Sequence, residues 1–213
     1  MLLLLPKHMG NEGYKDIIES QSTNYDKQRV KHYFKKTFSF FLSLIPEGSR
    51  VLDVGCGTGQ YSIGLAKHGR PCDGVDYSRK MIEIAAKNAQ SAHAACGFAL
   101  CDVEKGVTLN GPYDYALFVG NWEYFDNPCA VLRNVSSVLR PQGSIIISTP
   151  NMLAYPIIRW LELLHLKMAP AFWHFHSWRK SIKKAADGAG LRVAAVYWGF
   201  YGLDRVYSLR KNG

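Results

Sequence analysis

The chain has 213 residues, which is long enough for one α/β domain, and its hydrophobic share of 47% is typical of a globular protein. Five scattered cysteines without C-x-x-C spacing argue against a disulfide framework or a zinc site and favour a reducing compartment, and no apolar stretch approaches the roughly 18 residues of a membrane span. The net charge of +9 permits acidic substrates, anionic lipid surfaces or nucleic acid, but we expect its basic clusters at 27–36 and 179–184 to be solvated helical faces.

The expected elements alternate between helices and strands along most of the chain. Residues 24–45 have the apolar spacing of an amphipathic helix, which Pro46 and Gly48 end. Beyond it we expect strands at 50–54, 71–75, 97–101, 113–119 and 144–148, and helices from 58 to about 68, from 78 to about 90 and from 128 to 139. This alternation predicts βαβ units, and therefore a parallel sheet with helices on both faces.

The most informative segment is 50–61, Arg-Val-Leu-Asp-Val-Gly-Cys-Gly-Thr-Gly-Gln-Tyr. A short buried strand runs into Gly55, Gly57 and Gly59 and then into a helix. A ligand can lie against glycine backbone, and the helix N-terminus offers unpaired N–H groups and a positive dipole end, so we expect a polar or anionic ligand here. A dinucleotide fingerprint would need its third glycine at position 60, where the chain has Gln60.

With Asp53 on the strand, the pattern Asp53-x-Gly55-x-Gly57-x-Gly59 resembles motif I of the class I S-adenosylmethionine-dependent methyltransferases. Pro141-Gln142-Gly143 looks like the family's Leu-x-Pro-Gly-Gly turn, with Gln142 in place of its first glycine. The resemblance covers residues 24–149 well and the rest of the chain to 213 loosely.

The resemblance implies one domain over 1–213, with a Rossmann-like, seven-stranded, mostly parallel sheet, helices on both faces and an antiparallel edge hairpin. Residues 192–200 and 203–209 fit that hairpin. The expected parts are an N-terminal tail at 1–23, a cofactor-binding core at 24–149, a lid or acceptor insertion at 150–178, and a closing helix with the hairpin at 179–213.

The resemblance also implies S-adenosylmethionine as the cofactor. Asp76 follows the second strand and suits both ribose hydroxyls, with a helix N-cap partner as the alternative. Asp102 suits the adenine amino group and the Val103 N–H a ring nitrogen, while an exposed turn aspartate is the alternative. The expected cofactor-binding residues are Asp53, Gly55, Cys56, Gly57, Gly59, Asp76, Tyr77, Asp102, Val103, Val119 and Gly120.

The acceptor side is expected in the segment 151–178, which is rich in aromatic and aliphatic residues and has few acids. Such a lining suits a small-molecule site, while ordinary packing of an extra helix is the alternative. The candidate substrate-binding residues are Tyr25, Asn121, Trp122, Tyr155 and His174. The catalytic base stays open between His174 and Tyr124, which stands where many relatives have a histidine, and no metal site is expected.

We therefore expect methyl transfer from S-adenosylmethionine to a small, partly apolar molecule by in-line displacement, as in the family's small-molecule and quinone-precursor branch. The alternatives are a protein or RNA methyltransferase and a non-catalytic S-adenosylmethionine-binding protein. A small-molecule acceptor is the expected partner, without nucleic acid or a membrane span, and the expected compartment is the cytoplasm. No residue pattern indicates an oligomeric state.

Overall fold

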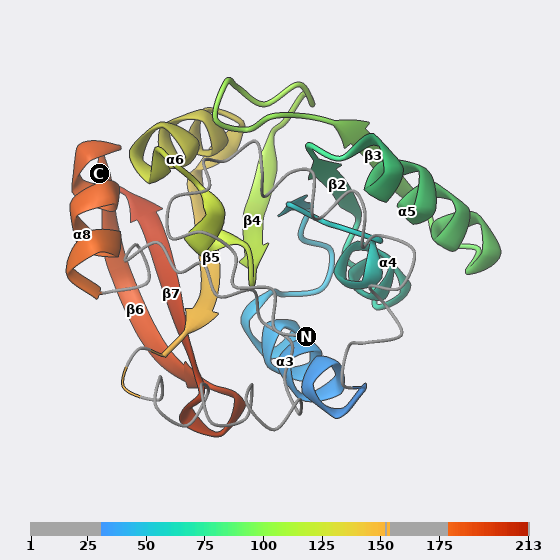
Figure 1. Ribbon diagram of the computed structural model, residues 1–213, viewed down its shortest axis with the longest axis horizontal. Helices are drawn as coiled ribbons and strands as arrows, with labels where there is room; N and C mark the ends of the chain where they lie inside the picture. The colour runs from blue at the N-terminus through green and yellow to red at the C-terminus, as the bar shows by residue number, and fades with distance from the viewer. Residues whose placement is uncertain (1–30, 152, 154–178, 213) are drawn as a thin grey trace, which may run out of the picture.

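The computed structural model describes residues 31–151, 153 and 179–212. Its centre is a seven-stranded sheet with the strand order β3-β2-β1-β4-β5-β7-β6 (Figure 1). The strands are β1 (Val51–Val54), β2 (Cys72–Asp76), β3 (Cys96–Leu100), β4 (Tyr113–Val119), β5 (Leu139–Pro150), β6 (Leu191–Gly199) and β7 (Asp204–Lys211). Only β7 runs antiparallel to its neighbours among these strands, which confirms the mostly parallel sheet and the hairpin at its edge.

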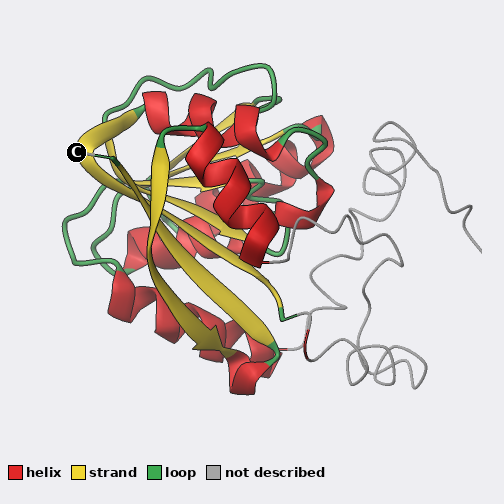
Figure 2. Cartoon of the chain, turned by 90° about the vertical axis from the view of Figure 1, so that its left-hand side faces the viewer, coloured by secondary structure: helices red, strands yellow, loops and turns green. Residues whose placement is uncertain are grey.

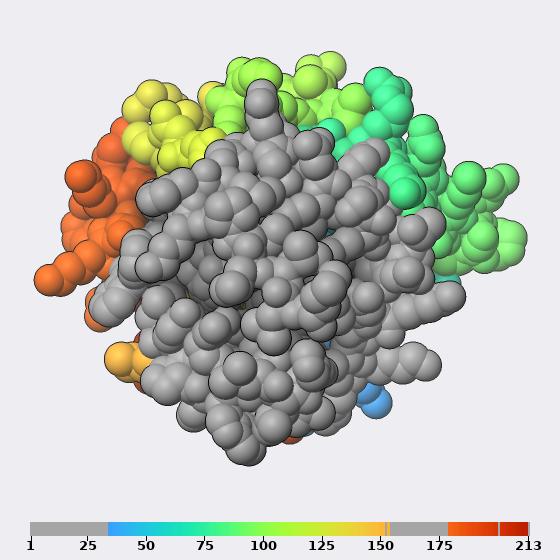
Figure 3. Space-filling view, in the orientation of Figure 1, coloured from blue at the N-terminus to red at the C-terminus, as the bar shows by residue number. Residues whose placement is uncertain are grey.

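Helices lie on both sides of the sheet, as Figure 2 shows. The helices are α3 (Lys31–Leu44), α4 (Gln60–Lys67), α5 (Arg79–Ser91), α6 (Pro128–Ser137) and α8 (Arg179–Gly188), with short 3₁₀ turns η2 (Trp122–Tyr124) and η5 (Phe200–Gly202). Figure 3 shows α5 and α8 at opposite edges of the molecule, in keeping with their contacts to β3 and β6. No helix in the described part of the chain is long and apolar enough to cross a membrane.

Alternation of side chains along the strands sends them into two hydrophobic cores. In β1, Leu52 and Val54 pack with side chains of α6 and α8, whereas Val51 packs with side chains of α3 and α4. Asp53 shares the Val51 face, because successive side chains of a strand point to opposite sides. An acidic residue in the middle of this buried strand therefore faces α4.

The described part of the predicted 24–45 helix is α3, whose Phe38 and Phe41 are buried and whose Lys35 and Lys36 are exposed. In α8 only Ile182 and Ala186 are buried, while the lysines Lys180, Lys183 and Lys184 are exposed. Where the structure describes them, the basic clusters are solvated helical faces, as predicted.

The strand β5 is longer than the predicted 144–148. Leu139 already pairs with Tyr113, and the register then slips so that Ser144 pairs with Tyr115. The segment 140–143, expected as a turn before the strand, is therefore a bulge within it, because pairing resumes on both sides. This is a correction to the length of the strand and leaves its direction unchanged.

Candidate functional site

The glycine loop joins β1 to α4 at the edge of the sheet where the parallel strands end. Gly55, Gly57 and Gly59 all have positive φ, at 66°, 54° and 82°. A Cβ on Gly55 would collide with the side-chain amide of Asn121, whereas a Cβ on Gly57 would have no heavy atom within 4 Å. The backbone at Gly57 is therefore open to an approaching ligand, and the backbone at Gly55 is packed against the protein.

Asp53 lies beneath this loop and is only 2% exposed. Its Oδ2 accepts a hydrogen bond of 2.6 Å from Oγ of Ser62, which belongs to α4. A cofactor contact for Asp53 stays a prediction, and the structure shows that its carboxylate ties β1 to α4. Sequence inspection missed Ser62, because a serine inside a helix carries no ligand signal of its own.

Asp76 at the end of β2 holds the loops of two strands with its carboxylate. Its Oδ2 accepts from the backbone N–H of Gly57 at 2.9 Å, and its Oδ1 accepts from the backbone N–H of Ser78 at 2.9 Å. Ser78 in turn caps α5 by accepting from Met81 N, as predicted. Both carboxylate oxygens of Asp76 therefore hold backbone where β1 and β2 end.

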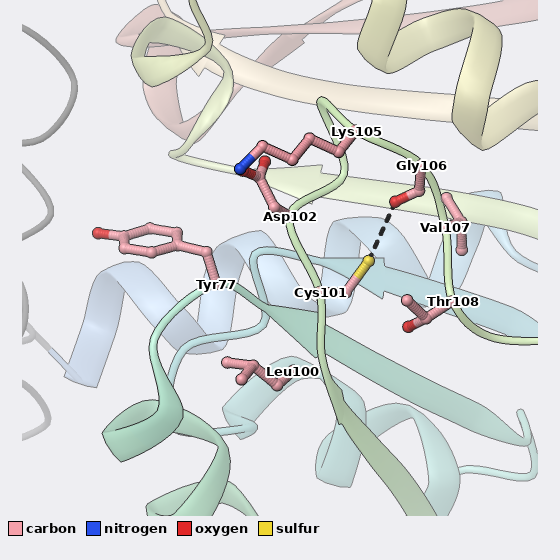
Figure 4. A pocket seen from close by; sticks show the side chains of 8 residues that line it. All are labelled: Tyr77, Leu100, Cys101, Asp102, Lys105, Gly106, Val107 and Thr108. Carbon is pink, nitrogen blue, oxygen red and sulfur yellow. Dashed lines mark hydrogen bonds and ion pairs between the residues drawn. The ribbon is translucent and has the colours of Figure 1, made fainter.

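A pocket of about 540 Å³ opens beyond the ends of β2 and β3, where Tyr77 follows Asp76. Figure 4 shows Tyr77 and Leu100 along one side and the loop of Asp102 to Thr108 along the other. The Asp102 carboxylate pairs with the Lys105 ammonium at 3.2 Å. Apolar walls with one charged pair suit a flat heteroaromatic ring that carries a few polar groups.

The backbone of this loop is held in place by Asn134 of α6. Its Nδ2 donates to the carbonyl oxygens of Val103 and Glu104, at 3.0 and 3.1 Å. The Val103 side chain is buried in the core, so only the Val103 backbone is a candidate for ligand contact. Asn134 had no signal in the sequence, because it reaches the loop from a helix 31 residues further along.

At the end of β4, Gly120 adopts a positive φ of 63° and leads the chain into η2. Val119 is buried in the core on the α3 side. Trp122 is 0% exposed and packs edge-on against Phe118, with ring centroids 5.7 Å apart. The ring of Trp122 thus packs in the core, and its role in substrate binding stays a prediction.

Asn121, the other predicted substrate residue here, lies over the end of β1. Its Nδ2 donates to the carbonyl oxygen of Val54 and, at 3.4 Å, to that of Gly55. Tyr124 closes η2 with its backbone N–H on the Asn121 carbonyl, at 3.2 Å, and its side chain is half-buried. The structure thus places Asn121 against the glycine loop, and Tyr124 lies in the same short turn after β4.

Cys56, between the first two glycines, is buried, and burial raises the pKa of its thiol well above the usual range. The carboxylates of Asp53 and Asp76 raise the pKa of Cys56 further. The thiol is therefore neutral and unreactive at physiological pH, so this cysteine contributes its backbone to the loop and no nucleophile.

The rest of the expected acceptor side, with Tyr25, Tyr155 and His174, lies outside the described residues. Asn151, where the 150–178 insertion leaves the sheet, donates through Nδ2 to the Gly202 carbonyl at 2.8 Å. The start of the insertion is therefore tied to the β6–β7 turn. Among the described residues, no three His, Cys, Asp or Glu side chains are grouped as a metal site would need.

Comparison with known proteins identifies the family to which the chain belongs. A family model described as a methyltransferase domain matches residues 25–196. A ubiquinone biosynthesis O-methyltransferase of Aeromonas salmonicida is 30% identical over 175 residues, which are 78% of this chain and 72% of that protein. The protein of the same name from Coxiella burnetii is 31% identical over 105 residues, 49% of this chain. The chain matches 45% of the length of that relative, about half.

Solved structures share the fold at lower identity. Magnesium protoporphyrin IX methyltransferase from Synechocystis, with bound S-adenosylhomocysteine, has a TM-score of 0.69 at 20% identity and covers 95% of this chain and 99% of its own. The [4+2]-cyclase SpnF has a TM-score of 0.75 at 12% identity, with 97% and 98% covered. At this identity the likeness establishes the fold alone, and the cyclase shows why the reaction must be argued from the site.

Proposed function

The chain belongs to the methyltransferase-domain family, and on that premise we propose that it transfers a methyl group from S-adenosylmethionine to a small, partly apolar molecule. The observation that carries the proposal is the bond between Asp76 and Gly57. It joins an open glycine loop to the acidic residue that ends β2, and the next residue, Tyr77, lines the pocket beyond β2 and β3.

The described residues fit this cofactor on structural grounds. The open space at Gly57 leaves the loop backbone accessible, and Asp76 is an acidic acceptor at the end of the neighbouring strand, as the two ribose hydroxyls require. The pocket lined by Tyr77, Leu100 and Asp102 has apolar walls for an adenine ring and a carboxylate acceptor for its amino group. Ligands of open α/β sheets bind outside the carboxyl ends of the strands, and these residues lie there.

S-adenosylmethionine supplies an electrophilic methyl group on a sulfonium with a neutral leaving group. The residues of the chain then need only to hold donor and acceptor in line and to exclude water. Orientation of this kind contributes on the order of 7–11 kcal/mol in favourable cases. Acceptor hydroxyls must also lose a proton, and Tyr124 and His174 are the side chains that we propose as candidates for that role.

The acceptor that we propose is a hydroxyl group on a small apolar frame. The curated relatives are named as O-methyltransferases of ubiquinone biosynthesis, which supports a hydroxyl acceptor over the amino groups of a protein or RNA. We also place the chain in the cytoplasm in this proposal, since all five cysteines are free thiols, as a reducing compartment requires.

Calorimetry with S-adenosylmethionine, S-adenosylhomocysteine and NAD tests the cofactor first. We expect dissociation constants on the order of micromolar for the two sulfur ligands and no competition by NAD. Tight NAD binding without binding of either sulfur ligand would overturn the assignment.

Turnover is then measured as S-adenosylhomocysteine release with dihydroxybenzoates that carry or lack an alkyl chain. We expect methylation, with the alkylated acceptors preferred because of their apolar surface. Transfer to folded protein or RNA alone, with no small molecule methylated, would contradict the proposed acceptor class.

A further inference from the structure

The side-chain amide of Asn121 forms hydrogen bonds through its nitrogen and not through its oxygen among the described residues. Its Nδ2 donates to two carbonyl oxygens, those of Val54 and Gly55, which occupies both amide hydrogens and fixes which side-chain atom is the oxygen. Its Oδ1 is buried and has no hydrogen-bond partner among the described residues. A buried acceptor without a donor is unfavourable, and such an atom in a binding crevice calls for an explanation.

The backbone holds Asn121 firmly in this position. Gly120 N donates to the Ser148 carbonyl at 3.2 Å, and the fully buried ring of Trp122 anchors the following turn in the core. The side chain packs so closely on the loop that a Cβ added at Gly55 would overlap it. Contacts within the protein therefore hold Oδ1 near the glycine loop.

The place of Asn121 in the sheet determines which part of a ligand it meets. In the strand order β3-β2-β1-β4, the pocket and Asp76 lie at β2 and β3, and Asn121 lies across the β1 loop at the end of β4. The order of the strands reverses between β1 and β4, which is where a crevice forms in such sheets. A ligand with its nucleoside end in the pocket must cross the glycine loop to reach Asn121.

If the nucleoside lies over β2 and β3, the amino-acid end of S-adenosylmethionine lies over β1 and β4. That end carries an α-ammonium group and a carboxylate, and only the ammonium donates to an amide oxygen. We propose that Asn121 is a cofactor-binding residue, whose Nδ2 clamps the glycine loop and whose Oδ1 accepts a hydrogen bond from the α-ammonium group. This inference rests on the proposed function and assigns one more residue to the same site.

Two ligands that differ at this end test the inference by calorimetry. S-adenosylhomocysteine has the α-ammonium group, and 5′-methylthioadenosine has the same nucleoside and thioether without it. For Asn121→Ala we expect S-adenosylhomocysteine to bind about tenfold more weakly or worse, because a charge-assisted hydrogen bond is lost, and 5′-methylthioadenosine to change by less than about threefold.

Asn134→Ala is the matched control, because Asn134 also donates through Nδ2 to two carbonyl oxygens, those of Val103 and Glu104, on the nucleoside side. It should change the affinities of both ligands by the same factor. Asn121→Asp keeps an acceptor and loses the donor, so it should prefer S-adenosylhomocysteine to 5′-methylthioadenosine at least as strongly as the wild type. This variant decides the question if Asn121→Ala does not fold.

The outcomes separate this inference from the function on which it rests. Equal weakening of both ligands by Asn121→Ala, or no weakening of either, would overturn the contact with the ammonium group while the wild type still bound both. A wild-type chain that bound neither ligand would overturn the proposed function as well.

Discussion

The carboxylate of Asp76 accepts a hydrogen bond from the backbone N–H of Gly57, with 2.9 Å between Oδ2 and N. Asp76 is the last residue of β2, Gly57 lies in the loop after the neighbouring parallel strand β1, and the two are 19 positions apart in the sequence. Asp76 therefore shapes the glycine loop through a contact within the protein itself. A binding loop that is ordered beforehand reduces the entropy lost when a ligand binds.

Replacing Asp76 with alanine should weaken both the cofactor complex and the fold. The side chain is only 7% exposed, and its removal leaves the N–H groups of Gly57 and Ser78 without their acceptor. We expect a loss in unfolding free energy of roughly 1.5–3 kcal/mol for each of these bonds, and cofactor affinity at least about tenfold lower. Urea unfolding and calorimetry measure the two effects.

Asp187→Ala is the control for that substitution, because Asp187 is exposed on α8, where its carboxylate pairs with the Lys183 ammonium. Its stability should stay within about 0.5 kcal/mol of the wild type. Unchanged stability in Asp76→Ala would mean that the loop keeps its shape without the carboxylate.

The two glycines Gly55 and Gly57 should respond differently to alanine. Both have positive φ, so each substitution should destabilise the fold by about 1–2 kcal/mol through backbone strain. Gly55→Ala adds a collision with Asn121, whereas the Gly57 methyl group would enter open space. Melting temperatures should therefore fall more for Gly55→Ala, while Gly57→Ala folds and binds S-adenosylhomocysteine poorly. Wild-type affinity in Gly57→Ala would show that no ligand lies against that residue.

Local patterns in the sequence predicted the strand, the glycine loop and the helix cap around the candidate cofactor site. The strand at 51–54, its glycines and the acid after β2 are close in the chain, so spacing alone indicated their arrangement. The cap by Ser78 follows from the same local chemistry. Positions of this kind are predictable because neighbouring residues determine them.

Contacts between distant segments were not predictable in the same way. Asn121 reaches Val54 across 67 positions, and Asn134 reaches Val103 across 31. Trp122 was expected at the acceptor because it follows a strand end, but the sequence does not show that its ring turns into the core. The start of β5 at Leu139 likewise depends on pairing with Tyr113, which a local pattern does not contain.

Ser62→Ala tests whether Asp53 has a structural role. The substitution removes the 2.6 Å bond to a carboxylate that is 2% exposed, so stability should fall by about 1–3 kcal/mol. Affinity for S-adenosylhomocysteine should stay within about threefold, because Ser62 lies beneath the loop. A large loss of affinity at unchanged stability would instead make this pair part of the ligand contact. Chemical denaturation and calorimetry on the same preparation separate the two results.

The cysteines should differ in their reaction with iodoacetamide. Burial raises the pKa of Cys56 far above 9.0 and that of Cys96 to about 11, so at pH 8 both are thiols rather than the reactive thiolates. A raised pKa means that the thiolate fraction grows only as the pH rises toward that value. We expect mass spectrometry of the folded chain at pH 8 to show Cys56 unlabelled, and labelling of all five cysteines in urea. Rapid labelling of Cys56 in the folded chain would contradict its burial.

The two candidates for the proton-accepting group can be separated by Tyr124→Phe and His174→Ala. Phenylalanine keeps the ring of Tyr124 within η2 and removes only the hydroxyl, while His174 belongs to the segment outside the described residues.

A histidine base must be deprotonated, so turnover in the wild type should fall as the pH drops through about 6.5. If His174 is the base, His174→Ala should lower kcat by about 10²–10⁴-fold and abolish that acidic limb, with cofactor affinity unchanged. Tyr124→Phe should then keep both the rate and the limb. The reverse pattern would assign the proton to Tyr124, and wild-type rates in both variants would mean that the acceptor hydroxyl loses its proton to water.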